Sequence, residues 1–296
     1  MTHRALSIIL PARNEASALD GILLEIHSLY PAAEIIVVDD GSSDETARVA
    51  RSHKATVISH PYSMGNGAAI KTGARTAHGD ILVFMDSDGQ HRPKDIALLL
   101  HKLDEGYDMV VGARARKSQA GMHRAAGNGL YNWVASWMTG RKIEDLTSGF
   151  RAVRSAKFRK FLYLLPNGFS YPTTITMAFF RSAYPVAYVP IQTDTRKGRS
   201  KINLLKDGIR FFIIILRIGA LFSPMRLFLP VSFLFFLLGT ALYSYTYITV
   251  GRFTNMSALL YIASMLTFLI GIVSEQVSSL HYKDANEDRT NQNNGQ

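Results

Sequence analysis

Two long uncharged stretches near the end of the chain constrain its fold more than any other feature. Leu227–Val250 has 24 residues and Thr254–Ser274 has 21, and three residues, 251–253, separate them. About 20 consecutive apolar residues are enough for a helix to cross a bilayer. The sequence therefore predicts a transmembrane helical hairpin, with a long buried hairpin of a soluble protein as the alternative.

Positive charge is distributed unequally around these two stretches. Five Lys or Arg residues lie between Lys201 and Arg226, whereas the turn holds one, Arg252. Because Lys and Arg are enriched in cytoplasmic segments, we expect an integral protein of the cell inner or plasma membrane with both termini in the cytoplasm. The apolar run Leu6–Leu10 stops at Pro11 and is too short for a secretory signal.

The same pattern predicts four segments. Residues 1–202 form a cytoplasmic domain. Residues 203–226 form an amphipathic juxtamembrane helix, because Lys206, Arg210 and Arg217 interrupt apolar residues there. Residues 227–280 form the hairpin, through which copies of the chain can associate. The polar tail 281–296 is expected to be cytoplasmic and disordered.

Short apolar runs alternate with helical patterns through the first domain. The expected strands are rich in branched residues, as strands buried on both faces are: Leu6–Leu10, Glu34–Val38, Thr56–Ile58, Ile81–Met85 and Met109–Val111. The expected helices between them are Ala16–Leu29, Asp44–Ser52 with Asp44 as N-cap, Gly67–Ala77 and Pro93–Glu105. This alternation predicts a doubly wound, mostly parallel α/β sheet, which binds ligands beyond the carboxyl ends of its strands. Farther along we expect helices over 125–138 and 155–164 and a strand over 187–191.

Acidic residues directly follow two of these strands. Asp39-Asp40 ends the second strand and Asp86-Ser87-Asp88 ends the fourth, so we expect the two groups beside each other at the ligand edge. Carboxylates one residue apart suit a hard divalent cation, and Gln90 can add an oxygen ligand. Such a cation bridges phosphate oxygens and neutralises a diphosphate leaving group. Taken singly, each acidic group also fits a structural role as a helix cap or a turn.

The charge balance indicates which partners to expect. The net charge of +10 calls for an anionic partner. The basic residues do not form one long run, and the last group lies just before the apolar stretches, which favours membrane lipid over nucleic acid. The chain has no cysteine, which excludes disulfides, thiolate zinc sites and cysteine nucleophiles.

A set of short motifs spans nearly the whole chain. They are Pro11-Ala12-Arg13-Asn14-Glu15, Asp39-Asp40-Gly41-Ser42-Ser43-Asp44, Gly65-Asn66-Gly67-Ala68-Ala69, Asp86-Ser87-Asp88-Gly89-Gln90-His91, Gly112-Ala113-Arg114, Gly127-Asn128, Asp145-Leu146-Thr147-Ser148-Gly149-Phe150-Arg151 and Arg196-Lys197-Gly198-Arg199-Ser200-Lys201. With them the chain resembles the family 2 glycosyltransferases, in the branch of dolichol-phosphate mannose synthase and the bacterial polyprenyl-phosphate glycosyltransferases. Arg13 stands where that family usually has an aromatic residue, and Asn66 where Lys is common. The resemblance implies a GT-A-type fold for residues 1–202.

The resemblance also implies roles for individual residues. The implied catalytic residues are Asp86, Asp88, Arg114 and Asp145. The implied contacts to the donor nucleotide are Pro11, Arg13, Glu15, Asp39, Asp40, Lys71, Ser87, Arg196 and Lys201. Those to the acceptor phosphate are Arg114, Arg124 and Asn128, and the implied ligands of Mg²⁺ or Mn²⁺ are Asp86, Asp88 and Gln90.

The implied reaction is inverting transfer of a hexose from a nucleotide-sugar to undecaprenyl or dolichyl phosphate. The second pKa of a phosphate monoester is about 6, so this acceptor is mostly dianionic at neutral pH and needs no general base. Asp145 then orients the donor sugar or serves as an optional base. The long isoprenoid tail keeps the acceptor in the bilayer, which gives the apolar helices their purpose.

Three other functions remain open from the sequence. A membrane-bound glycosyltransferase acting directly on a glycan or protein would need a strong base. A processive polysaccharide synthase usually carries a Gln-x-x-Arg-Trp motif, which this sequence lacks. An inactive membrane scaffold would not be expected to keep Asp86, Asp88 and Gln90.

Overall fold

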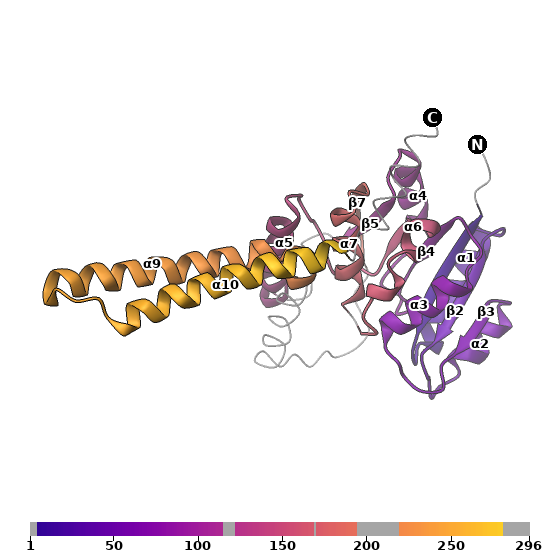
Figure 1. The fold of residues 1–296 in the computed structure, drawn as a ribbon. Coiled ribbons are helices and arrows are strands. Elements are labelled where there is room, and N and C mark those ends of the chain that lie inside the picture. The colour runs from indigo at the N-terminus through magenta and orange to yellow at the C-terminus, as the bar shows by residue number, and fades with distance from the viewer. Residues whose placement is uncertain (1–4, 115–121, 169, 194–218, 281–296) are drawn as a thin grey trace. The chain divides into compact units, whose positions relative to one another are not determined.

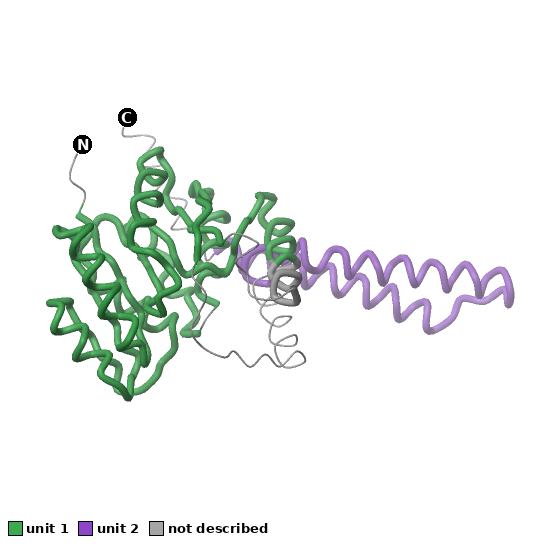
Figure 2. The backbone as a smooth tube through the Cα atoms, turned by 180° about the vertical axis from the view of Figure 1, so that it is seen from behind, with its two compact units in different colours: residues 1–201 green, residues 202–296 purple. Residues whose placement is uncertain are grey.

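The computed structural model describes residues 5–114, 122–168, 170–193 and 219–280, and of residues 122–131 it describes the backbone and, for Gly129, its surroundings. The chain divides into two compact units, residues 1–201 and 202–296 (Figure 2). The first contains a sheet with its helices, and the second contains two long helices. The predicted juxtamembrane helix falls mostly on residues 203–218, outside the described part, and so does the tail 281–296.

A seven-stranded sheet organises the first unit (Figure 1). Its strands are β1 (Leu6–Ala12), β2 (Glu34–Asp39), β3 (Thr56–Ser59), β4 (Ile81–Phe84), β5 (Met109–Arg114), β6 (Arg151–Arg154) and β7 (Val186–Ile191). The spatial order is β3-β2-β1-β4-β6-β5-β7. The described pairs are parallel except those that β6 makes with β4 and β5. The predicted mostly parallel α/β sheet is therefore confirmed, with one antiparallel strand that the sequence pattern did not predict.

Helices connect the strands. Their bounds are α1 (Ala16–Leu29), α2 (Thr46–Ser52), α3 (Asn66–Thr76), α4 (Ile96–Asp104) after a 3-10 turn at Pro93–Asp95, α5 (Met122–Thr139), α6 (Ser155–Arg159), a 3-10 turn at Leu162–Leu164, and α7 (Tyr171–Arg181). The face of α1 that enters the core repeats at helical spacing: Leu19, Ile22, Leu23 and Ile26 are buried. Burying each such side chain contributes about 1.5–3 kcal/mol to folding.

Several local expectations were wrong in detail. The helix expected over 155–164 is broken into α6 and a 3-10 turn, and α7 was not predicted at all. Strand β3 lies at the edge of the sheet and is exposed or half-exposed, rather than buried on both faces. Helix α2 begins at Thr46 instead of Asp44, although the Asp44 Oδ1 accepts a hydrogen bond from the Thr46 backbone N–H at 3.0 Å.

The order of the strands also corrects one expectation about the ligand edge. The two acidic strand ends, on β2 and β4, are not neighbours, because β1 lies between them. From β1 the chain adds β2 and β3 on one side and β4 on the other. The crevice at such a reversal of strand order, beyond the carboxyl ends of the strands, is where open α/β sheets bind their ligands.

The second unit is an antiparallel hairpin of α9 (Pro224–Val250) and α10 (Asn255–Leu280). Gly251 ends α9 with φ 66°, a left-handed conformation that glycine adopts without strain. Both helices are long and apolar enough to cross a membrane, and the apolar windows that qualify them are 11% and 17% buried. This exposure differs from the buried core helices of a soluble protein, the alternative that the sequence left open.

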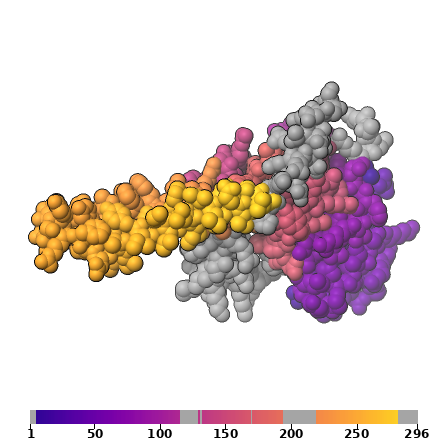
Figure 3. All heavy atoms as spheres, viewed as in Figure 1, coloured from indigo at the N-terminus to yellow at the C-terminus, as the bar shows by residue number. Residues whose placement is uncertain are grey.

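Small residues hold the two helices together. Ser232 and Ser264 exchange hydrogen bonds, each Oγ donating to the other's backbone carbonyl at 2.9 Å. A Cβ added at Gly271 would lie 3.0 Å from the Cβ of Phe228, so glycine permits this close approach. Figure 3 shows the side chains of α9 and α10 meeting along the hairpin. Such small-residue seams are typical of helix pairs in membranes, where backbones must approach closely.

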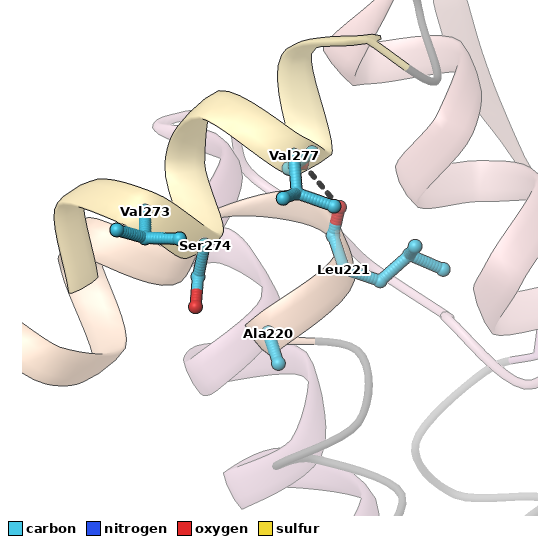
Figure 4. A pocket seen from close by; sticks show the side chains of 6 residues that line it. Ala220, Leu221, Val273, Ser274 and Val277 are labelled. Atoms are coloured by element: carbon cyan, nitrogen blue, oxygen red, sulfur yellow. Dashed lines mark hydrogen bonds between the residues drawn. The ribbon is translucent and has the colours of Figure 1, made fainter. Parts of the chain in front are cut away.

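A shallow groove of about 200 Å³ lies at one end of the hairpin, where the short helical stretch before α9 meets the last turns of α10. The Ser278 Oγ donates a hydrogen bond to the Leu221 carbonyl at 2.6 Å across it (Figure 4). The other lining residues are mostly apolar: Ala220, Val273, Ser274 and Val277.

Candidate active site

The carboxyl ends of the parallel strands bring most of the predicted site residues to one edge of the sheet. Pro11 is the penultimate residue of β1 and Asp39 ends β2, while Asp86 follows β4 and Arg114 ends β5. Since β6 runs in the opposite direction, the loop before it, which contains Asp145, lies at this edge too. The Ser87 Oγ donates to the Pro11 carbonyl at 2.9 Å and ties the loop after β4 to the carboxyl end of β1.

The predicted metal ligands lie in the loop after β4. Asp86, Asp88 and Gln90 are partly exposed, whereas β4 itself and Ser87 are buried. The backbone N–H of Gln90 donates to the Asp88 Oδ1 at 3.1 Å, which fixes the turn between them. Within the described ranges, no three acidic or histidine side chains converge as a metal site. The candidate set is instead two carboxylates and a carboxamide, oxygen donors that Mg²⁺ and Mn²⁺ accept.

Asp86 is held in place by close neighbours. A Cβ added at Gly149 would lie 2.7 Å from the Asp86 Oδ2, so the absence of a side chain there makes room for the carboxylate. The buried His91 places its Nε2 3.9 Å from the same oxygen and stacks on Phe150, with ring centroids 5.0 Å apart. Burial lowers the pKa of His91 to about 4, so the ring is neutral at physiological pH.

Arg114 and Asp145 form a two-pronged ion pair. The Arg114 Nε donates to the Asp145 Oδ2 at 2.7 Å, and the Arg114 Nη2 donates to Oδ1 at 2.9 Å. The Nη2 also donates to the Thr147 Oγ1 at 2.6 Å. Such a fork fixes the plane of the guanidinium as well as its position. Asp145 is 3% exposed, whereas the Arg114 side chain is 27% exposed, so the pair presents its cation toward the outside.

This environment makes Asp145 a weak base. Burial opposes ionisation, but the hydrogen bonds and charge of Arg114 and the backbone N–H of Thr147 outweigh it and lower the pKa of the carboxyl. Its oxygens also accept hydrogen bonds from the N–H groups of Thr147 and Ser148, both at 3.1 Å. The sequence analysis left open that Asp145 orients the donor sugar or serves as a base. The contact seen here is a different one, with Arg114, and the lowered pKa does not favour proton abstraction.

The carboxylate of Asp40 accepts several hydrogen bonds from within the protein. Its carboxylate accepts hydrogen bonds from His60 and Ser63 and from the backbone N–H groups of Met64 and Gly65, all at 2.8–2.9 Å. Burial opposes ionisation, but these donors together lower the pKa of Asp40. Asp40 therefore shapes the loop that leads from β3 into α3.

Its neighbour Asp39 is placed differently at the end of β2. The Asp39 Oδ1 accepts the Ser42 N–H at 3.0 Å, and the side chain is 5% exposed. Asp39 is thus tied to its own turn by this bond, whereas four donors from a second loop surround Asp40.

The other predicted donor contacts within the described residues lie in the loop after β1 and on α3. Arg13 is exposed and Glu15 is half-buried just before α1. Lys71, on α3, donates its Nζ to the Leu165 carbonyl at 3.1 Å and to the Asn167 Oδ1 at 2.5 Å. Lys71 thus fastens the segment before α7 to α3. Arg196 and Lys201 lie outside the described residues, and the side chains of Arg124 and Asn128 are not described.

Arg151, within a motif of the family resemblance, has a structural importance that the sequence analysis did not recognise. Its side chain is fully buried, and its partners include the Pro172 carbonyl and the Thr176 Oγ1, both at 3.2 Å, and the Ser148 carbonyl. It thereby links α7 to the loop that carries Asp145. A charged residue within the otherwise apolar run Phe150–Val153 was the available signal.

Comparison with known proteins gives two matches to family sequence models. The model described as "Glycosyl transferase family 2" matches residues 7–164, and that described as "GtrB C-terminal hairpin" matches residues 223–280. The first spans the sheet edge described above. The second coincides with α9 and α10.

Individual relatives match over much of their length. "Glycosyltransferase AglJ" from Haloferax volcanii is 28% identical over 295 residues, 95% of this chain and 96% of its own. "Dolichyl-phosphate hexose transferase" from the same organism is 28% identical, covering 70% of this chain and 90% of its own. "Polyprenol monophosphomannose synthase" from Mycolicibacterium smegmatis is 29% identical, and the match covers 68% of this chain and 82% of its own.

A solved structure has the same fold. Glucosyl-3-phosphoglycerate synthase from Mycobacterium tuberculosis, crystallised with Mn²⁺, uridine diphosphate and phosphoglyceric acid, superposes with a TM-score of 0.59 at 24% identity. The match covers 72% of this chain and 76% of that one. At this identity the likeness supports the GT-A-type fold alone.

Proposed function

This chain belongs to glycosyl transferase family 2, and we propose that it transfers a hexose from a nucleoside-diphosphate sugar to a polyprenyl phosphate at the cytoplasmic face of a membrane. In this reaction the bond from the anomeric carbon to the donor diphosphate breaks. A bond from the same carbon to an oxygen of the lipid phosphate forms with inversion, and a nucleoside diphosphate leaves.

The proposal rests on the presence of two features in one chain. The family 2 sheet edge is followed by a hairpin whose apolar surface is mostly exposed, as a bilayer requires. Relatives named for dolichyl phosphate and polyprenol acceptors support the same acceptor class. We infer that α9 and α10 span the membrane with the first unit on the cytoplasmic side, since the basic residues precede the hairpin.

The cation of this site, Mg²⁺ or Mn²⁺, would be held by Asp86, Asp88 and Gln90. The presence of Mn²⁺ with a uridine diphosphate in the structural neighbour supports a metal here. When bound, such a cation neutralises the diphosphate of the leaving nucleotide. Gly149 leaves room for the Asp86 carboxylate in this role, and the His91 Nε2 lies 3.9 Å from it.

The protein's own part in the reaction is orientation and electrostatics. Asp145 fixes the guanidinium of Arg114, and the exposed side of that guanidinium can bind phosphate oxygens. A lipid phosphate is mostly dianionic at neutral pH, its second pKa being about 6, so no proton need be removed before it attacks. A weakly basic Asp145 is consistent with such an acceptor and would be a poor choice for a sugar hydroxyl.

Donor recognition is proposed at β1 and β2. Pro11 and Asp39 lie at the carboxyl ends of these strands, and Arg13 and Glu15 follow β1. The planar guanidinium of Arg13 can stack on a nucleobase as an aromatic residue would. Asp40 and Lys71 contribute by holding the neighbouring loops.

The experiment uses the full-length protein in membranes with labelled nucleotide-sugars, Mn²⁺ and undecaprenyl or dolichyl phosphate. We expect label in the organic-extractable lipid with the native protein and none with Asp88→Asn. Asp20→Asn, which alters a hydrogen-bonded contact between the exposed Asp20 and His53, is the matched control and should retain activity. Label confined to the aqueous phase or to protein would refute the lipid acceptor and favour a glycan or protein acceptor.

A further inference from the structure

Asn14 has a backbone conformation that few residues with a side chain adopt. Its φ is 55°, in the left-handed region, and among the described non-glycine residues Lys54 and Ala183 share this feature. Asparagine is one of the residues that tolerate this region best. Such backbone outliers cluster at functional sites, where a particular path of the chain is required. Asn14 lies between Arg13 and Glu15, two of the predicted donor contacts.

The side chain of Asn14 joins the loop after β1 to the loop after β2. Its Oδ1 accepts hydrogen bonds from the Ser43 backbone N–H at 2.8 Å and from the Ser43 Oγ at 3.3 Å. In the opposite direction, the Asn14 N–H donates to the Ser42 Oγ at 3.0 Å. One residue therefore both donates to and accepts from the same turn, although 28 and 29 positions in the sequence separate the partners.

The next two residues continue this contact. The Glu15 N–H donates to the Thr46 Oγ1 at 2.9 Å, and the Ala16 N–H donates to the Asp44 Oδ2 at 3.2 Å. Asp44 is held in turn, because its Oδ1 accepts the Thr46 N–H at 3.0 Å. The start of a helix leaves its first N–H groups without partners in the helix, and here the neighbouring loop supplies them for α1.

The contact between residues 14–16 and 42–46, which we call the clasp, continues the pairing of β1 with β2. The two strands pair in parallel register as far as Ala12 and Asp39. Arg13 lies between the end of this pairing and the start of the clasp, so its backbone is held on both sides. The clasp therefore fixes the path of the chain through the donor contacts that follow β1.

We propose that Asn14 is a positioning residue of the donor site. Its left-handed backbone turns the chain from β1 into α1, and its amide oxygen holds that turn against Ser43, so that Arg13 and Glu15 meet the nucleoside in one fixed arrangement. Because both hydrogen bonds of this oxygen go to Ser43, Asn14 acts through its neighbours. A preorganised set of contacts binds more tightly, since less conformational freedom is lost on binding. The inference rests on the proposed function, in which these residues bind the donor nucleotide.

Lys54 shows what a left-handed residue does when it serves the fold alone. Its φ is 58°, and its N–H donates to the Arg51 carbonyl at 3.0 Å, within the turn that ends α2. The next strand, β3, begins at Thr56, so Lys54 lies at the amino end of the strands, away from the ligand edge. Lys54 is therefore a control matched in backbone conformation and remote from the donor contacts.

The test measures binding of uridine diphosphate and of guanosine diphosphate, each with Mn²⁺, to the full-length protein in detergent by titration calorimetry. Asn14→Gly keeps the left-handed backbone and removes the bonds to Ser43. It should weaken binding of the preferred nucleotide about fivefold, the change that corresponds to one ordinary hydrogen bond. Asn14→Asp retains an acceptor oxygen and should bind more tightly than Asn14→Gly. Lys54→Gly should bind like the native protein.

Kinetics separate positioning from folding. In vesicles with labelled nucleotide-sugar and polyprenyl phosphate, Asn14→Gly should raise KM for the nucleotide-sugar several-fold and leave kcat and KM for the lipid unchanged. A lower Tm with equal changes in both KM values would assign Asn14 to folding and overturn the inference. Unchanged nucleotide affinity in Asn14→Gly would also overturn it, while labelled lipid from the same variant would leave the proposed reaction intact. A native protein that binds neither nucleotide and labels no lipid would refute the proposed function, and the inference with it.

Discussion

Replacing Asp145 with Asn tests the assignment of this residue as the holder of Arg114. The change keeps the shape of the side chain and removes its charge, so only one oxygen remains for the two donors at 2.7 and 2.9 Å. Breaking a buried ion pair by removing one partner costs about 3–5 kcal/mol. Because the Arg114 side chain is 27% exposed and water can replace part of the lost contact, we expect about 2–3 kcal/mol.

This loss should be visible in thermal unfolding of the full-length protein in detergent, followed by near-ultraviolet circular dichroism. For a unit of this size, about 1 kcal/mol shifts Tm by 2–4 °C, so Asp145→Asn should lower Tm by about 4–12 °C. Asp108→Asn is the matched control. Asp108 is also buried and pairs with two cations, Arg154 at 3.3 Å and Lys157 at 2.6 Å, but at the amino end of β5. It should lower Tm similarly.

Activity distinguishes the two variants. A misplaced guanidinium of Arg114 should reduce kcat/KM by about 10²-fold in Asp145→Asn, the scale of a catalytic group displaced by 1 Å. Asp108→Asn should keep near-native kcat/KM. Native stability of Asp145→Asn, or equal activity losses in the two variants, would refute the reasoning.

The pH dependence of stability offers a second check on the same pair. Burial alone would raise the pKa of Asp145, but Arg114 and the backbone donors lower it in the folded protein. Its stabilising contribution is thus present above the ordinary value of 3.8 and is lost as the pH falls through the lower folded value. The difference in Tm between the native protein and Asp145→Asn should therefore shrink below pH 3.8. A constant difference down to strong acid would contradict the assignment.

Three further outcomes are expected. Asp88→Asn should abolish Mn²⁺ binding measured by paramagnetic resonance without a change in Tm, since Asp88 is partly exposed and packs no core; a normal Mn²⁺ affinity would exclude it as a ligand. Gly149→Ala should weaken Mn²⁺ binding, because the new Cβ would come within 2.7 Å of the Asp86 Oδ2; unchanged affinity would mean that Asp86 need not occupy this position. Ser232→Ala and Ser264→Ala, read by unfolding of the hairpin in detergent, should each cost about 0.5–1.5 kcal/mol, because each removes one hydrogen bond to a backbone carbonyl; native stability of both variants would mean that the reciprocal bonds do not stabilise the hairpin.

The sheet was predictable because its central strands are continuous apolar runs. Residues 6–10, 34–38 and 81–85 have no polar interruption strong enough to suggest another structure, and each proved to be a buried strand. The sequence pattern did not predict β6, because Arg151 and Arg154 flank only two apolar residues. Helix α7 was hidden because Pro172 and several Thr residues lower its helix propensity. Its stability comes from burial on nearly all sides, which depends on the packed neighbours rather than on the local sequence.

The sequence predicted the chemistry of the candidate site better than the role of each residue in it. The acidic residues at strand ends indicated a ligand edge, and the strand order places that edge at β1 and β4. The sequence could not show that Asp40 is enclosed by the loop at 60–65 while the Asp39 carboxylate accepts a hydrogen bond from its own turn. Nor could it show that Asp145 and Arg114 pair, because 31 residues separate them and the pairing depends on the antiparallel placement of β6.

The most direct test of the central claim is the chemical identity of the lipid product. The full-length protein in vesicles, given a panel of nucleotide-sugars, Mn²⁺ and polyprenyl phosphate, should yield a lipid whose mass equals the acceptor plus one anhydrohexose. That mass contains one phosphate, because glycosyl transfer leaves both donor phosphates on the released nucleoside diphosphate. A product with two phosphates would show transfer of a sugar phosphate, and a hexose found only on protein or glycan would show another acceptor. Either result would contradict the account.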